Sequence, residues 1–303
     1  MKEKQITMLE RSIQELKRLT LTEGVFSSLS FFYWSLDQYV FSRLIQRLVY
    51  NRMNGYVLKK LNNSSVRMIL IASDSGISQE LMRKGTHEPL STKILMENVH
   101  EGMRIVDIGA NLGYFALQEA KAVGPKGVVY AVEPVPSNWF LLKQNIALNN
   151  LSNVEVYNLA MGDRDGVLDM FLSGGSNWGS ALRTTLNYDR KIAVPCQRLD
   201  SFLKDKGHVD LVRMDVEGYE ANVVDGMTET LKQKGLMLFM ELHPLFARKR
   251  CEAMLRKLDD YGFVPFAVVG HYDARLVKNV KTIGDLLRDR YLMGTIFHGF
   301  FRN

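Results

Sequence analysis

Two segments of the sequence combine small residues with a carboxylate at places where a ligand could bind. The segment "VDIGANLGYF" (106–115) carries Gly109 and Gly113, and Glu133 ends the later apolar run "VVYAVE". Glycines in a strand-to-helix turn permit unusual dihedrals and let a ligand approach the backbone. A carboxylate at the end of the next strand can accept hydrogen bonds from ribose hydroxyls. Together they predict a site for a nucleoside-bearing ligand.

The spacing of the glycines argues against a dinucleotide. In the G-x-G-x-x-G turn, the middle glycine lets the backbone approach a pyrophosphate, but here Asn111 occupies that place. A ligand without phosphates needs less room. A nicotinamide oxidoreductase is therefore disfavoured, and the sequence shows no obvious hydride-transfer constellation.

Two more acidic residues stand at the end of another apolar run, "VDLVRMDVEGYE" (209–220). Asp215 and Glu217 alternate on one face of this predicted strand, and Gly218 begins the turn that follows. Carboxylates at the end of a central strand are costly to bury unless they are paired or used. This pair would suit a cation. In "NVEVYNLAMGDRDG" (153–166), Asn158 and Ala160 end a third strand and could border an adenine pocket.

Alternating apolar runs and helical patterns predict the elements that position these residues. Strands are expected at 66–73, 103–108, 127–132, 154–159, 167–172, 209–216, 236–242, 263–269 and 291–299, with helices at 77–85, 91–99, 113–123, 137–149, 220–233 and 246–261. This alternation predicts an α/β fold with a mostly parallel, twisted sheet and helices on both faces. Such sheets bind ligands at the carboxyl ends of their strands.

The chain divides into three predicted parts. Residues 1–65 form a helical N-terminal extension, residues 66–100 a lead-in strand and helices, and residues 101–303 the main domain. Apolar residues recur at helical spacing within 25–50, and aromatic residues gather at 31–34. We expect this segment to pack on the main domain or on a second copy of the chain in a homo-oligomer. The alternative is a helix that lies in a membrane surface.

The composition is that of an ordinary globular protein, with 303 residues, 46% hydrophobic and 24% charged. Of the net charge of +6, +5 falls within residues 1–100, which hold 14 Lys and Arg against 9 Asp and Glu. The two cysteines, Cys196 and Cys251, lie far apart without metal-ligand spacing, and the N-terminus lacks the apolar core of a signal peptide. These features favour a cytoplasmic protein.

Several motifs together resemble the FkbM-type methyltransferases, which use S-adenosylmethionine. The motifs are "VDIGANLGYFAL", "VYAVEP", "NLAMGD", "SNWGSAL", "DLVRMDVEGYE" and "FMELHP", and the resemblance covers roughly 85–300. It implies a Rossmann-like class I methyltransferase fold. It also implies methyl transfer to a hydroxyl group of a small molecule, a sugar, a glycan, a lipid or a polyketide.

The resemblance also assigns residues to the cofactor, S-adenosylmethionine. The implied cofactor-binding residues are Asp107, Gly109, Ala110, Asn111, Gly113, Glu133, Pro134, Asn138, Asn158, Ala160 and Asp215. Among them, Glu133 would hold the ribose, Asn158 and Ala160 would flank the adenine, and Asp215 would lie near the methionine end. This agrees with the chemistry inferred above, because the cofactor has a ribose, a sulfonium cation and no phosphates.

Methyl transfer to an alcohol needs a positioned acceptor and benefits from a general base. The catalytic candidates are Glu217, His243 and Asp215, and an imidazole such as that of His243 titrates near neutral pH. The substrate-binding candidates are His87, Glu88, Asn177, Ser180 and Glu241, and the glycine-containing stretch 173–188 could cover the site. No cluster has convincing metal spacing, so no metal is predicted.

Two further interpretations stay open. The sequence pI of about 9.1 is compatible with an RNA methyltransferase, although nucleic acid is an unlikely partner because the base-flipping motif of amino-group methyltransferases is absent. The second interpretation is a non-catalytic protein that binds the cofactor or docks on a membrane. The intact Glu133 and "DVEGYE" disfavour this interpretation.

Overall fold

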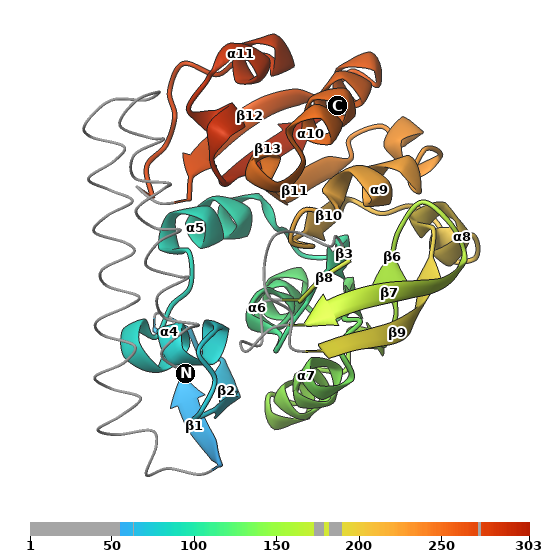
Figure 1. Ribbon diagram of the computed structural model, residues 1–303. Coiled ribbons are helices and arrows are strands. Elements are labelled where there is room, and N and C mark those ends of the chain that lie inside the picture. The colour runs from blue at the N-terminus through green and yellow to red at the C-terminus, as the bar shows by residue number, and fades with distance from the viewer. Residues whose placement is uncertain (1–54, 63, 173–178, 182–189, 272–273) are drawn as a thin grey trace.

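The computed structural model describes residues 55–303 except 63, 173–178, 182–189 and 272–273 (Figure 1). The predicted helices before residue 55, including the segment 25–50, and the candidate Asn177 lie outside the described residues. Within the described part, none of the helices is both long and apolar enough to cross a lipid bilayer.

A seven-stranded sheet forms the centre of the protein, in the order β12-β13-β11-β10-β3-β4-β5. The strands are β3 (Arg104–Ile108), β4 (Val128–Val132), β5 (Val154–Tyr157), β10 (Leu211–Met214), β11 (Met237–Leu242), β12 (Val264–Gly270) and β13 (Phe297–Arg302). All run parallel except β13, which is antiparallel to both of its neighbours. The strand order reverses between β3 and β10, where such sheets bind ligands. The predicted class I methyltransferase fold is confirmed.

Helices cover both faces of this sheet, as predicted (Figure 1). They are α4 (Ile77–Lys84), α5 (Pro89–Asn98), α6 (Tyr114–Val123), α7 (Pro136–Leu148), α8 (Leu199–Leu203), α9 (Glu220–Asp225), α10 (Pro244–Asp260) and α11 (Ile283–Arg288), with 3-10 turns at Thr230–Lys232 and Leu292–Gly294. Two apolar cores result. Val106 and Ile108 of β3 belong to the core beneath α9 and α10, and Ile105 belongs to the core beneath α6 and α7. Burial on both faces explains why the strands read as continuous apolar runs.

A second, smaller sheet is inserted between β5 and β10, in the order β6-β9-β7-β8. Its strands are β6 (Ala160–Met161), β7 (Gly166–Leu172), β8 (Gly179–Ser180) and β9 (Arg190–Gln197). The prediction for 167–172 identified β7 but missed β9. Along β7, Leu168, Met170 and Leu172 are buried, whereas Val167 and Asp169 are exposed. This alternation turns one face of the small sheet toward the main domain.

Residues 56–60 are not helical, which corrects the prediction of a helical extension over 1–65. They form β1 (Tyr56–Lys60), which pairs antiparallel with β2 (Arg67–Ile71) from Tyr56↔Ile71 to Lys60↔Arg67. Pairing with a neighbouring strand satisfies the backbone of this short segment, which is too short for an isolated helix.

Two later elements also differ from the prediction. The helix expected over 220–233 ends at Asp225. Gly226 follows it, at a position where a side chain would overlap the carbonyl oxygen of Gly162. The strand expected over 291–299 starts only at Phe297, since α11 and the 3-10 turn Leu292–Gly294 come before it. A capping box at Thr282 and Asp285 begins α11.

A buried ion pair joins the two central strands. Arg213 of β10 donates from Nη1 to Asp107 Oδ1 of β3 at 2.9 Å and lies 3.3 Å from Asp215 Oδ2, and its guanidinium stacks 4.0 Å over the ring of Phe115. Glu119 of α6 is fully buried nearby. Burial, reinforced by the charge of Asp107, raises the pKa of Glu119 well above its ordinary value, so the buried site favours the protonated form of this acid.

The two buried side chains should therefore respond differently to neutral substitution. We expect Arg213→Gln to lower the free energy of unfolding by about 3–5 kcal/mol at pH 8, because it leaves Asp107 buried without its counter-charge. Glu119→Gln is the matched control and should change it by less than about 1 kcal/mol, because glutamine resembles the protonated acid that burial favours. Urea unfolding followed by circular dichroism measures both. Equal losses would contradict this assignment of charge.

Candidate functional site

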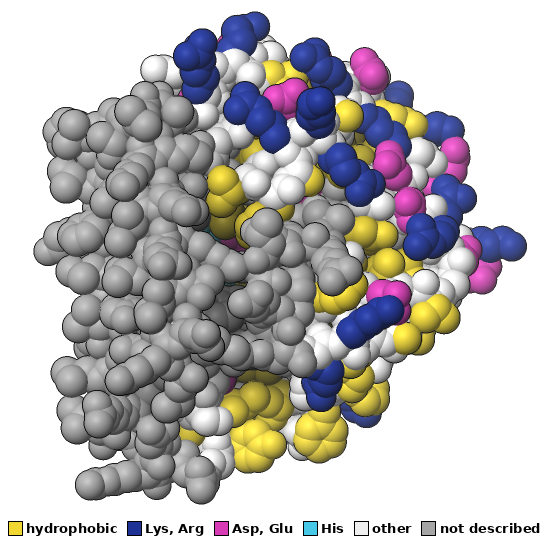
Figure 2. Space-filling model, in the orientation of Figure 1, with side chains coloured by type: hydrophobic (Ala, Val, Ile, Leu, Met, Phe, Trp, Pro, Cys, Tyr) yellow, Lys and Arg dark blue, Asp and Glu magenta, His cyan; other side chains and the backbone are white. Residues whose placement is uncertain are grey.

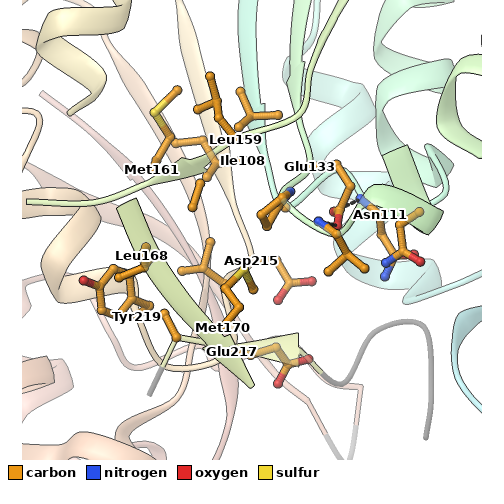
Figure 3. Close-up of a pocket in the computed structure, with 18 residues that line it drawn as sticks. Ile108, Asn111, Glu133, Leu159, Met161, Leu168, Met170, Asp215, Glu217 and Tyr219 are labelled. Atoms are coloured by element: carbon orange, nitrogen blue, oxygen red, sulfur yellow. Dashed lines mark hydrogen bonds between the residues drawn. The ribbon is translucent and has the colours of Figure 1, made fainter. Parts of the chain in front are cut away.

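A cavity of about 640 Å³, including its open mouth, lies at the carboxyl ends of β3, β4 and β10 (Figure 3). The lining residues are Ile108, Gly109, Asn111, Val132, Glu133, Pro134, Val135, Asn138, Leu159, Ala160, Met161, Leu168, Met170, Ala181, Asp215, Val216, Glu217 and Tyr219.

The cavity has an apolar side and a polar side. Figure 3 shows Leu159, Met161 and Leu168 toward one end, and Glu133 and Asn111 toward the other. Met161, Leu168 and Met170 come from the small sheet, and sequence reasoning missed them as site residues. The alternation in 167–172 was a signal for a buried face but not for what that face would cover.

Glu133 is held at the polar side by hydrogen bonds from the protein. Its Oε2 accepts from the Asn111 amide at 2.8 Å, its Oε1 accepts from the Val135 amide at 2.9 Å, and the Asn138 side chain also donates to it. Burial raises the pKa of Glu133 to about 7, against these hydrogen bonds. Because a carboxylate offers about four acceptor positions, at least one remains for a ligand hydroxyl.

The glycines of the turn after β3 are required by packing within the protein as well as by the cavity. Gly109 has φ +81°, and a side chain there would overlap the carbonyl oxygen of Asp215. Gly113 has φ +97°, and a Cβ would lie 2.7 Å from Leu142. Asn111 takes a left-handed conformation (φ 52°) without being glycine, and this conformation is strained for most residues. The close approach of β10 is thus one reason for glycine at 109.

Of the predicted cofactor residues, seven line the cavity and four do not. The seven are Gly109, Asn111, Glu133, Pro134, Asn138, Ala160 and Asp215; the four are Asp107, Ala110, Gly113 and Asn158. Asp107 pairs with Arg213, and Asn158 donates to the carbonyl oxygens of Glu133 and Pro134 at 2.9 and 3.0 Å. Asp107 and Asn158 thus hold the ends of β3 and β4 in place.

Asp215 presents a carboxylate oxygen that has no hydrogen-bond partner among the described residues. This atom, Oδ1, is buried, while Oδ2 faces Arg213. Burial, with the nearby charge of Glu241, raises the pKa of Asp215 to about 7, although Arg213 opposes this shift. A buried acceptor of this kind fits an ammonium or another cationic donor.

Glu217 and His243 form a linked pair at the edge of the cavity. His243 Nε2 lies 3.5 Å from Glu217 Oε2, and His243 Nδ1 is bonded to Glu220 Oε1 at 2.8 Å. Burial alone would lower the pKa of His243, but Glu220 and its neighbouring acids raise it well above its ordinary value. Burial also raises the pKa of Glu217. Glu217 lines the cavity, whereas His243 lies behind it, nearly fully buried.

Two further predicted residues differ in position: Ser180 contacts Glu217 of this pair, whereas His87 contacts Glu80 and does not line the cavity. The Ser180 hydroxyl donates to the carbonyl oxygen of Glu217 at 2.7 Å, which fixes the backbone of that residue at φ 53°. His87 bonds Glu80 at 2.6 Å, and although burial opposes it, Glu88 and Glu80 raise the pKa of His87 to about 10. His87 therefore carries a positive charge at neutral pH.

Glu88 and Glu241 meet two histidines that sequence reasoning missed, His271 and His298. A second group joins Asp215, Glu241 and His243, whose ligand atoms lie within 4.8 Å of one another. The prediction of no metal rested on spacing in the sequence, and spacing cannot reveal residues that come together only in the fold.

The site fits S-adenosylmethionine by its chemistry. The apolar side can take an adenine, Glu133 can accept a ribose hydroxyl, and the unpartnered Oδ1 of Asp215 can accept from an ammonium. Glu217, which lines the same cavity, can take up a proton.

Comparison with known proteins identifies the same chemistry. Residues 107–265, just over half of the chain, match the family described as the methyltransferase FkbM domain. The 2-O-methyltransferase NoeI of Sinorhizobium fredii is 30% identical over 144 residues, which are 42% of this chain and 58% of that protein. The chain thus spans little more than half the length of this relative.

Two other comparisons were found. The methyltransferase sdnD of Sordaria araneosa is 29% identical over 192 residues, 52% of this chain and 73% of that protein. The crystal structure of the methyltransferase FkbM from Methylobacillus flagellatus covers 65% of this chain and 43% of its own, with 14% identity and a TM-score of 0.42. The fold assignment therefore rests on the strand order described above.

The packing role of Gly109 can be measured separately from the effect of its left-handed backbone conformation. Gly102 also has a positive φ (+86°), but a Cβ there meets nothing within 4 Å. We expect Gly102→Ala to cost about 1–2 kcal/mol of unfolding free energy from left-handed strain alone. Gly109→Ala should cost roughly 1–3 kcal/mol more, because it also displaces the backbone at Asp215. Thermal and urea unfolding of the ligand-free variants measure this, and equal costs would refute the packing role.

Proposed function

This chain belongs to the FkbM family of S-adenosylmethionine-dependent methyltransferases, and from this premise we propose that it methylates a hydroxyl oxygen. The acceptor class is a hydroxyl of a sugar, glycan, lipid or polyketide-like molecule. The main observation behind the proposal is that Glu217, a partly exposed carboxyl, lies beside Asp215 in the cavity that fits the cofactor. The name of the relative NoeI, a 2-O-methyltransferase, supports oxygen as the acceptor atom.

Three parts of the cavity wall would hold the cofactor. Glu133 would accept a ribose hydroxyl, Asp215 would accept the ammonium of the methionine part, and Leu159 and Met161 would contact the adenine. When bound, S-adenosylmethionine supplies a methyl group on a sulfonium, which is open to in-line attack. The chain has to hold the acceptor oxygen in line with that methyl group.

Glu217 is the proposed general base. Its raised pKa makes it a stronger base than an ordinary carboxylate, and it is exposed to the cavity, whereas His243 is not. The protonated His243, held by Glu220, would position Glu217 and stabilise its carboxylate form. The proton of the acceptor hydroxyl would pass to Glu217 as the new oxygen–methyl bond forms.

The surface supports a neutral acceptor better than RNA. In Figure 2, Asp and Glu side chains lie among the Lys and Arg side chains over the C-terminal helices, although Lys and Arg are the more prominent. On α10, Arg248 pairs with Glu252 and Lys257 pairs with Asp225, each at 2.9 Å. Nucleic-acid binding usually depends on clustered, unpaired basic groups.

The test of the proposed function is a transfer assay with methyl-labelled S-adenosylmethionine. The purified full-length chain is incubated with cell extracts separated into glycan, lipid, small-molecule and RNA fractions. We expect label in one of the hydroxyl-bearing fractions other than RNA, stable to mild base as an ether is. Label in RNA alone would replace the acceptor class. Cofactor binding without transfer to any fraction would favour the non-catalytic alternative.

The proposed base can be tested with the acceptor that this assay identifies. We expect Glu217→Gln to lower kcat by about a hundred- to ten-thousandfold, because it removes proton uptake. Cofactor affinity, measured by calorimetry, should stay nearly unchanged. Glu97→Gln, at an exposed position of α5, is the control and should retain full activity. A Glu217→Gln enzyme with normal kcat would exclude this role.

Cofactor binding should be linked to proton release by Glu133. Its folded-state pKa of about 7 lies above the ordinary 4.5, so its protonated form stabilises the free protein and this contribution is lost as pH rises through 7. Ribose hydroxyls favour the ionised form. Binding at pH 6.5 should therefore release a proton, and affinity should rise between pH 5 and 7.

Calorimetry in two buffers of different ionisation enthalpy measures this release. The readout is the difference between the native protein and Glu133→Gln, which leaves Asp215 in place. We expect the variant to release less proton and to bind the cofactor roughly 10- to 100-fold more weakly, as for a lost hydrogen bond to a charged group. The same proton release in both proteins would show that Glu133 does not take part.

A further inference from the structure

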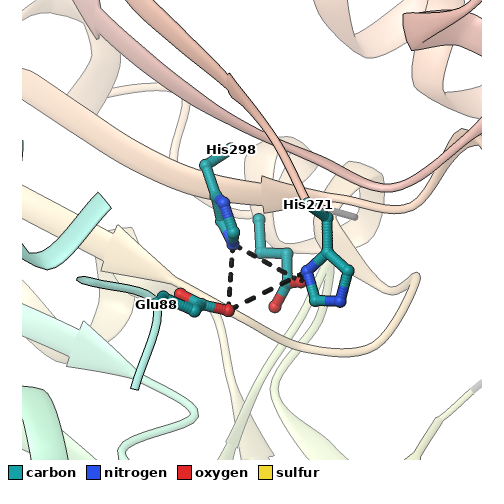
Figure 4. A group of neighbouring side chains, drawn as sticks. Glu88, His271 and His298 are labelled. Atoms are coloured by element: carbon teal, nitrogen blue, oxygen red, sulfur yellow. Dashed lines mark ion pairs between the residues drawn. The ribbon is translucent and has the colours of Figure 1, made fainter. Parts of the chain in front are cut away.

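Four side chains that are distant in the sequence converge beside the cofactor cavity (Figure 4). Glu88 precedes α5, Glu241 lies in β11, His271 follows β12 and His298 lies in β13. One ligand atom of each lies within 4.8 Å of all the others. Figure 4 shows the imidazoles of His271 and His298 and the carboxylate of Glu88 pointing toward a common centre.

The separations fit the coordination shell of a small ion. His298 Nε2 lies 3.1 Å from Glu88 Oε1 and 3.5 Å from Glu241 Oε1, and His271 Nδ1 lies 2.9 Å from Glu241 Oε1 and 4.0 Å from Glu88 Oε1. Ligands at 2.0–2.1 Å around a tetrahedral zinc ion are about 3.4 Å apart. The four distances given above are distributed on both sides of this ligand–ligand separation.

His298 points to a ligand independently of the cluster's composition. Its side chain is only 2% exposed, and its Nδ1 is bonded to the Ser91 hydroxyl at 3.0 Å. Its buried Nε2 has no partner with hydrogen-bond geometry among the described residues, although it faces two carboxylates. Metal-binding histidines characteristically use their second nitrogen in this way, because that bond fixes the ring and the tautomer.

Charge and backbone agree with this arrangement. Two carboxylates balance a divalent cation, and neutral imidazoles complete the shell without adding charge. Glu88 adopts a left-handed conformation (φ 44°) that aims its side chain into the cluster. The alternative is an ion-free cluster in which imidazolium groups pair with the two carboxylates at the distances given above.

We propose that Glu88, Glu241, His271 and His298 bind a divalent transition-metal ion of the zinc class. The two nitrogen ligands favour such an ion over Mg²⁺, which prefers six oxygen ligands. Glu241 also borders Asp215 and His243, so the ion would lie next to the methyl-transfer site. Resting on the proposed function, its role is to bind the acceptor oxygen and make that hydroxyl more acidic for Glu217.

The metal site is tested on the full-length protein after removal of metals with a chelator. Co²⁺ is titrated as a spectroscopic substitute for Zn²⁺, and Zn²⁺ is then added in competition. We expect one equivalent of Co²⁺ to bind with the intense visible absorption of four-coordinate cobalt, and Zn²⁺ to displace it. Saturation with no such absorption, or no stoichiometric binding, would overturn the proposal.

Variants locate the ion. We expect His298→Asn and Glu88→Gln each to weaken Co²⁺ binding at least tenfold, and Ser91→Ala to weaken it roughly 10- to 100-fold through the orientation of His298. His100→Asn, at an exposed histidine, is the control and should bind normally. Circular dichroism confirms folding, and two different ligand substitutions guard against one that fails to fold. Normal binding by both folded ligand variants would refute the site.

Cofactor binding is measured in the same samples to separate the two proposals. If the protein binds S-adenosylmethionine and transfers methyl groups but binds no Co²⁺, the metal site is wrong and the proposed function stands. If it binds Co²⁺ through these four residues but transfers no methyl group, the proposed function fails and the metal site stands. With both correct, removal of metal should lower kcat and leave cofactor affinity nearly unchanged.

Discussion

The buried ion pair between Asp107 and Arg213 is the interaction on which the site depends. It joins β3 to β10 at the point where the strand order reverses, and the same guanidinium faces Asp215 at the cavity wall. A charge buried without its partner costs several kcal/mol. The cofactor turn and the acidic strand end are therefore not independent motifs, because one cation fixes both.

The backbone of the same region is built around close approaches. Gly109 admits the carbonyl oxygen of Asp215, and two residues further along Glu217 takes a left-handed conformation supported by Ser180. Residues held in sparsely populated conformations require a surrounding structure that determines them. Here the small sheet provides it, since Ser180 belongs to β8, and β7 of that sheet walls the cavity.

The sequence predicted those parts of the site that depend on local pattern. Glycines after β3, an acid at the end of β4 and acids after β10 follow from strand ends and spacing, and the mostly parallel direction of the strands follows from their alternation with helices. Arg213 was missed because a single arginine inside an apolar run gives no sign of its partner. His298 and Glu88 are separated by more than two hundred residues and meet only because β13 runs antiparallel into the sheet.

The distribution of charge explains why this strand-end region suits both a sulfonium compound and a metal ion. Asp215, Glu217, Glu220 and Glu241 crowd around one buried imidazole, that of His243. Burial and their mutual repulsion raise the pKa of Asp215 and Glu217, which favours the protonated form of both acids. A bound cation would favour their ionised form instead. The cofactor, the metal ion and the acceptor can then contact the same carboxylates, and none of these carboxylates is left as an unpaired buried charge.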